Sequence, residues 1–208
     1  MGTIPLDTDV IVNHVVVTAV GTTPSRFWAE EPGGGEYSGI VVFAGMRGDA
    51  LGVADLQIGD VVDITGVSDE YLDVSEINIS GAAATLVVVD SGQDLAPDVV
   101  DVSVFATNLA AEPWESALVR IEGAPLTVTA LDAAYPEYTV SDGNDEVVID
   151  DFIYDSMGGD FPGLSFDMDG SMGVGANFDA IQGPVNWFND TWKIMPRAEA
   201  DLEGYAAP

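Results

Sequence analysis

The chain has 208 residues and a formal net charge of −31 at pH 7, from 36 acidic and 5 basic residues. Because phosphate binding needs lysine and arginine, a surface this negative argues against nucleic acid as a partner. Cysteine is absent, which excludes disulfides, thiolate catalysis and cysteine-ligated zinc.

Strand patterns recur in two series along the chain. Alternating or continuous β-branched runs, separated by Gly, Asp and Asn, predict strands. The first series lies at 10–20, 26–30, 39–45, 60–67 and 72–79. The second lies at 117–131, 138–142, 146–155, 179–188 and 191–195. Five runs followed by five runs of similar spacing indicate an internal duplication of a five-stranded unit.

The stretch "LQIGDVVDITGVSDEYLDVSEI" suggests how one such unit is built. Gly59 and Asp60 form a turn that starts a long strand, in which Ile64 and its alternate neighbours face the core. Gly66 allows the bend or bulge that closure of a small barrel requires. The run 72–79 then returns as the closing strand.

The connection 90–116 has a different pattern. Val102, Phe105, Ala106 and Leu109 stand at helical spacing, and a proline follows them, so we expect a short helix. The predicted domains are therefore 1–89, a linker with a short helix at 90–116, and 117–208.

These segments resemble a known family. "VVVTAVG", "GIVVFAG", "LQIGDVVDITGVSDEY" and "LDVSEI" are similar to the first oligonucleotide/oligosaccharide-binding (OB) barrel found beside secreted bacterial nucleases and in bacterial surface lipoproteins. "ESALVRIEG", "YTVSDG", "VVIDDFIYD", "FDAIQGPV" and "WKIMPRAEADL" are similar to the second barrel of that tandem region. The resemblance implies an all-β chain of two tandem five-stranded OB-type barrels, exported to the cell surface or the extracellular space.

Three features depart from that family or leave the location open. The nuclease relatives carry their chemistry in a downstream domain that this chain does not show. The helix often found between the third and fourth strands is not expected, because 46–55 is glycine-rich and a long loop at 156–177 replaces it in the second unit. Residues 1–7 lack the basic and apolar regions of a signal peptide, so they neither indicate nor exclude secretion. No run of 18 apolar residues occurs, so no membrane span is predicted.

A catalytic centre is not expected. His14 is the single histidine, and with no cysteine most nucleophile–base triads are excluded. Carboxylate pairs arise by chance among 36 acids, so none is selected. No cofactor is predicted to be essential.

Calcium is the candidate ion, because Asp-rich loops that contain glycine supply several oxygen ligands. The candidate ligands are Asp150, Asp151, Asp155, Asp160, Asp167 and Asp169. "SFDMDG" starts like an EF-hand, but Ala176 stands where the bidentate glutamate is required, so a true EF-hand is rejected. The alternatives are an irregular calcium site or a solvated acidic loop.

Aromatic and basic residues form two candidate ligand platforms of the kind that OB barrels use for bases or sugars. The first consists of Arg26, Trp28, Phe43 and Arg47, and the second of Trp187, Trp192 and Lys193. Strand alternation prevents Phe27 and Trp28 from lying on the same face. In the alternative reading, these aromatics fill the barrel cores and shield the barrel ends.

The sequence therefore predicts a non-catalytic, exported or surface-displayed module that acts by binding or assembly. Its partners would be another protein, a second copy of the chain, or a polysaccharide. Two alternatives are an accessory region that contacts nucleic acid beside an extracellular nuclease, with calcium bridging phosphates, and a module that binds carbohydrate or cell wall. The net charge also suits saline or divalent-rich surroundings, or simply a soluble monomer.

Overall fold

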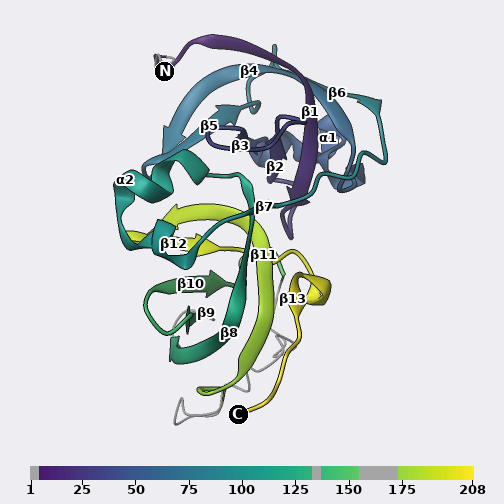
Figure 1. Cartoon of the computed structure of the whole chain (residues 1–208). Helices are drawn as coiled ribbons and strands as arrows, with labels where there is room; N and C mark the ends of the chain where they lie inside the picture. Colours follow the sequence, from purple (N-terminus) through teal and green to yellow (C-terminus); the bar gives the residue numbers. More distant parts are fainter. Residues whose placement is uncertain (1–4, 133–136, 155–172) are drawn as a thin grey trace. The chain divides into compact units, whose positions relative to one another are not determined.

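A computed structural model describes residues 5–132, 137–154 and 173–208. The described chain is all-β, with two helices of four residues each, and it divides into two compact units (Figure 1). Unit 1 comprises 1–96 and 114–118, and unit 2 comprises 97–113 and 119–208.

Unit 1 contains a closed ring of five strands. Its elements are β1 (Asp9–Val20), β2 (Arg26–Glu30), β3 (Gly39–Phe43), β4 (Val61–Tyr71), β5 (Val74–Asn78) and β6 (Thr85–Asp90). The pairing order is β1-β2-β3-β5-β4-β6, and β1 also pairs with β4, which closes the ring and leaves β6 outside it. Only the β3–β5 contact is parallel. Phe27, Val42, Ile64 and Ile77 are buried inside the ring, as the alternation of each strand predicts.

Gly66, at which a bend or bulge was predicted, lies where β4 changes partners. Residues 61–65 of β4 pair with β6, and residues 67–71 pair with β5. A Cβ on Gly66 would come within 2.8 Å of the Asn78 carbonyl oxygen, so the close approach of β5 requires glycine. Gly59 adopts a φ of 91° in the turn before the strand, as the sequence suggested.

The glycine-rich segment between β3 and β4 does form helix, so the expectation of none in unit 1 is wrong. It contains η1 (Gly45–Arg47), α1 (Gly48–Leu51) and η2 (Val53–Asp55). A Cβ on Gly48 would come within 1.5 Å of the Pro24 carbonyl oxygen. The glycine therefore lets this short helical segment pack against the β1–β2 loop, and Val53 and Leu56 enter the core beside it.

Unit 2 has a second closed ring. Its strands are β7 (Asp98–Val99), β8 (Leu118–Asp132), β9 (Glu137–Ser141), β10 (Glu146–Asp150), β11 (Asn177–Phe188), β12 (Thr191–Ile194) and β13 (Leu202–Glu203). The order is β13-β11-β12-β10-β9-β8-β7, with a further β11–β8 pairing. The pairing order of β8 to β12 thus repeats that of β1 to β5, and β10–β12 is parallel as β3–β5 is.

The ten predicted strands are all present, whereas β6, β7 and β13 were not predicted. In place of one linker helix, the segment forms three short helical pieces: the 3-10 helix η3 (Val102–Ala106), the α-helix α2 (Asn108–Ala111) and the 3-10 helix η4 (Glu112–Trp114). Leu109, expected to pack, is 89% exposed, whereas Val102 and Phe105 are buried. Residues 97–113 of the predicted linker group with unit 2, and residues 114–118 group with unit 1.

Candidate ligand-binding face

The first predicted platform lies on the side of β2 and β3 that faces away from the core of unit 1. Arg26 pairs with Phe43 across the two strands, and its guanidinium carbon lies 5.8 Å from the centre of the Phe43 ring. Trp28 pairs with Val41 on the same side. The structure therefore brings Arg26, Trp28 and Phe43 together, but Trp28 is only 1% exposed, so it offers no open surface for a ligand to stack on.

The chain itself occupies one end of this face. The backbone N–H of Leu118 donates to Glu30 Oε2 at 2.9 Å, and the N–H of Ser75 donates to Glu115 Oε1 at 2.9 Å. A Cβ on Gly39 would come within 2.2 Å of the Ala117 nitrogen. Residues 115–118 therefore lie directly against β2, β3 and β5.

Arg47 and Glu76 also serve the fold of unit 1. Arg47 donates to the carbonyl oxygens of Ile79 and Gly81, in the loop after β5. Glu76 is 8% exposed, and burial, then the charge of Asp69, raises the pKa of its carboxyl group. Because Arg47 is held by main-chain oxygens, it is not a free cation beside the platform.

The second platform is built around Lys193 on β12. Cross-strand register places Lys193 beside Val148, and Glu137 opposite Asp150. Lys193 Nζ forms an ion pair with Glu137 and lies 3.5 Å from Asp150 Oδ2, with the Phe188 ring centre 5.3 Å away. Lys193 is 2% exposed. Burial, opposed by Lys193 and reinforced by Glu137, raises the pKa of Asp150 to about 6.

Two adjoining hollows open on the surface of unit 2. One has a volume of about 440 Å³ and is lined among others by Leu131, Asp132, Glu137 and Asn189. The other, of about 360 Å³, is lined by residues that include Asn108, Glu146, Asp190 and Trp187. Thr139, Val148 and Thr191 line both hollows, so the two adjoin, and together they are called the depression below. Its polar groups are hydroxyls, amides and carboxylates.

Trp187 supplies the aromatic surface of this depression. It is half-buried, and its ring centre lies 4.9 Å from that of Trp192, at an interplanar angle of 51°. Trp192 is 5% exposed, and its Nε1 donates to Asn108 Oδ1 at 3.2 Å. Trp192 thus packs against the Trp187 ring from the neighbouring strand β12. The sequence missed Thr139, Asn189 and Thr191, although alternation with Lys193 places Thr191 on the same face.

The predicted calcium ligands lie mostly outside the described residues. Asp155, Asp160, Asp167 and Asp169 all do so, and Asp150 is held beside Lys193. Among the described residues, no group of three or more His, Asp or Glu side chains could hold a metal. The calcium site therefore stays a prediction.

His14 contacts a neighbouring strand of unit 1. It lies in a bulge of β1 at a φ of 59°, and its N–H donates to Asp63 Oδ1 at 2.9 Å. Its Nδ1 lies 3.5 Å from the same oxygen. The contact joins β1 to β4 on the exposed side of unit 1.

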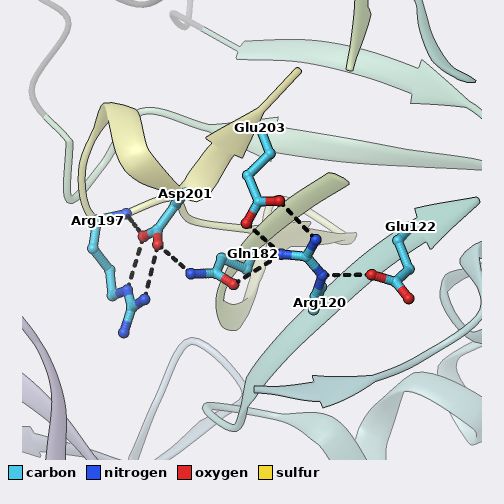
Figure 2. Close-up of polar contacts among 6 residues, drawn as sticks. All are labelled: Arg120, Glu122, Gln182, Arg197, Asp201 and Glu203. Carbon is cyan, nitrogen blue, oxygen red and sulfur yellow. Dashed lines mark hydrogen bonds and ion pairs between the residues drawn. The ribbon is translucent and has the colours of Figure 1, made fainter. Parts of the chain in front are cut away.

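The remaining cations, Arg120 and Arg197, belong to a network that joins β8, β11 and the C-terminal segment of unit 2 (Figure 2). Arg197 Nε and Nη2 donate to Asp201 Oδ2 and Oδ1, each at 2.8 Å. Gln182 Nε2 donates to Asp201 Oδ1 at 2.7 Å, and Arg120 Nη1 donates to Gln182 Oε1 at 3.3 Å. All five basic side chains of the chain are thus engaged by neighbours within the fold.

Comparisons with known proteins found only distant structural similarity to this chain. No family model matches it, and no curated protein matches it. The HINa domain of Ifi202, solved in complex with a 20-base-pair double-stranded DNA, is similar over 91% of this chain and 92% of its own, with 11% identity and a TM-score of 0.37. A structure described as the molecular basis for abrogation of activation of pro-inflammatory cytokines covers 91% and 89%, with 10% identity and a TM-score of 0.37.

Similarity at that level carries no argument about function. Within the described ranges, no helix is long and apolar enough to cross a membrane.

Proposed function

We propose that the chain is a non-catalytic binding module of two tandem OB-type barrels. The ring order first-second-third-fifth-fourth-first, with a parallel contact between the third and fifth strands, supports this for both units. OB barrels bind oligonucleotides or oligosaccharides on the face of strands two and three, flanked by the loops after strands one and four. In unit 2 the depression lies over β9 and β10 and reaches Asp132 and Asn189, which adjoin those two loops. We therefore assign the ligand site to this depression.

The observation that supports the ligand class is the chemistry of the lining: its one cation is buried and paired, and its other polar groups are hydroxyls, amides and carboxylates. Lys193, the single basic residue that lines the depression, is 2% exposed and paired with Glu137 and Asp150. The other polar groups that line the depression are threonine hydroxyls, asparagine amides and carboxylates, and Trp187 lies among them. A sugar ring packs its apolar face on an indole and donates its hydroxyls to carboxylates. The ligand we propose is an uncharged polysaccharide.

The second candidate is the nucleic-acid accessory role, and it needs a bridging cation. A phosphate backbone would meet Asp132, Glu146 and Asp190 in the depression without a free lysine or arginine. Like charges in such a site repel unless a divalent ion lies between them. Display outside the cell, which a polysaccharide ligand would fit, is part of the proposal.

The test is a screen of neutral and acidic glycans, followed by titration calorimetry on each hit. Trp187→Ala is expected to weaken binding to neutral glycans at least tenfold. Tyr71→Ala, which removes a 60% exposed aromatic from unit 1, is the matched control and should bind as the parent does. Absence of any glycan binding would overturn the ligand class. A labelled single DNA strand tests the second candidate. If the strand binds only with calcium, and Trp187→Ala abolishes that binding, the depression would be a nucleic-acid site instead.

A further inference from the structure

Unit 1 carries an open sheet edge at β6. In the described part of the chain β6 pairs with one strand, β4, and ends the sheet order (Figure 1). Val87, Val88 and Val89 are 50%, 50% and 43% exposed. An edge strand presents a row of backbone N–H and C=O groups that can pair with another chain.

This edge lacks the usual protection against pairing. Natural edge strands carry lysine or proline, or turn away at a bulge. Residues 85–90 read TLVVVD and contain neither lysine nor proline. The register shift lies only at the far end, where Val61 pairs with Asp90 and Val62 with Val88. The segment from Thr85 to Val88 is therefore a regular template.

Apolar and acidic side chains flank the edge. Ile11, 71% exposed, lies opposite Thr65, which in turn lies opposite Thr85. Asp63 lies opposite Val87, and Asp90 ends the strand. Ile11 and Asp63 thus lie on the two strands next to β6 in the sheet, and Asp90 adds a carboxylate on β6 itself.

The net charge of the chain indicates which kind of partner would pair with the β6 edge. A second copy would bring another surface of net charge −31 against this one, and like charges across an interface are unfavourable. All five basic side chains are engaged inside the fold, so none is free to meet the partner copy's carboxylates. We propose that the β6 edge binds an extended segment of another protein, with alternating apolar and basic residues, as an added strand.

The probe is a fluorescein-labelled heptapeptide of alternating valine and lysine, measured by fluorescence anisotropy at 150 mM salt. One control peptide carries N-methyl groups on alternate backbone nitrogens, which preserves charge but removes the pairing donors. A second replaces valine with serine. We expect both controls to bind at least tenfold more weakly than the probe, because strand addition needs backbone pairing and side-chain contact together.

Two double variants locate the site on the protein. Val87→Lys with Val89→Lys should weaken binding of the probe at least tenfold. Tyr71→Lys with Leu72→Lys adds the same charge at exposed positions at the β4–β5 turn and should change it less than threefold. Amide shifts of the parent protein on titration should cluster at 85–90, which tests the site even if a variant fails to fold.

Three outcomes would overturn the proposal: equal binding of the N-methylated peptide, equal binding by the β6 variant, or a dimer in light scattering that the β6 variant abolishes. The last would assign the edge to a second copy. Trp187→Ala should leave probe binding unchanged, so a failure of the glycan proposal is separable from a failure here.

Discussion

Arg120 holds Glu203 by two parallel hydrogen bonds, from Nη1 to Oε1 at 2.7 Å and from Nη2 to Oε2 at 2.8 Å (Figure 2). Its Nε donates to Glu122 Oε2 at 2.6 Å, so one guanidinium joins β8 to β13. The hydrogen bond from Arg120 lowers the pKa of Glu203. The two-residue strand β13 depends on this pair for much of its attachment.

Arg120→Lys should therefore loosen the C-terminal segment. Lysine keeps the charge but loses the planar fork, and we expect a loss of about 1 kcal/mol in the free energy of unfolding. Hydrogen exchange should rise at residues 199–206. Glu122→Ala, which removes only the contact to Arg120 Nε, should leave exchange there nearly unchanged. Equal exchange in the parent and in Arg120→Lys would contradict the assigned role.

Asp150 makes the stability of unit 2 depend on pH. Its folded pKa of about 6, raised first by burial, exceeds the ordinary value of 3.8. The folded state then holds the proton more tightly, so this contribution to stability is complete below pH 4 and is lost as pH rises to 6 and above. Asp150→Asn does not titrate, so its stability relative to the parent should rise across that window by as much as about 3 kcal/mol.

Urea unfolding at several pH values measures this difference. Asp190→Asn serves as the control for removing one negative charge at an exposed position of the same face. A constant difference between Asp150→Asn and the parent from pH 4 to pH 8 would show that Asp150 does not titrate in this range.

Replacing Trp28 should mainly lower stability, whereas replacing Trp187 should mainly weaken glycan binding. Trp28 is 1% exposed, so Trp28→Ala removes a buried indole and should cost about 3–5 kcal/mol. Trp187 is half-buried at the surface, and its replacement by alanine should cost less stability while weakening glycan binding. Denaturant unfolding and calorimetry on both variants check this. A fully stable Trp28→Ala protein would contradict the buried position.

Gly39 should tolerate no side chain. Its Cβ would meet the backbone of Ser116 and Ala117 at 2.2 Å, so Gly39→Ala must displace residues 114–118 and should cost more than about 2 kcal/mol. Gly33→Ala has no atom within 4 Å of the new Cβ and is the matched control, with an expected change below about 0.5 kcal/mol. Thermal unfolding distinguishes the two. Similar melting temperatures would mean that 114–118 does not lie against β3.

Calcium should raise the melting temperature if the acidic loop binds it. A ligand that binds only the folded state stabilises that state. Calcium, magnesium and sodium chloride at matched ionic strength separate specific binding from screening of the net charge of −31. We expect calcium to exceed both other salts. Equal shifts of the melting temperature in all three salts would contradict a specific calcium site and would be explained by charge screening.

Alternation of apolar residues was enough to predict ten strands and an all-β chain. Each strand pattern is local, since a two-residue period places neighbouring side chains on opposite faces whatever the partner. The turn at Gly59 and the special position of Gly66 in β4 were predictable because glycine marks both in the chain. The helix after β3 was not predictable, because Gly48 faces Pro24, a contact invisible from the composition of 46–55.

The candidate site was likewise only partly predictable from the sequence. Residue types along β12 identified Trp192 and Lys193 as residues of interest, but not what they do. Lys193 is neutralised by Glu137, 56 positions away, and Trp28 lies on a face that residues 114–118 partly occupy. Which charges are free and which aromatics are open depends on contacts between distant segments. Those contacts exist only once the strands have paired, so tertiary structure alone decided them.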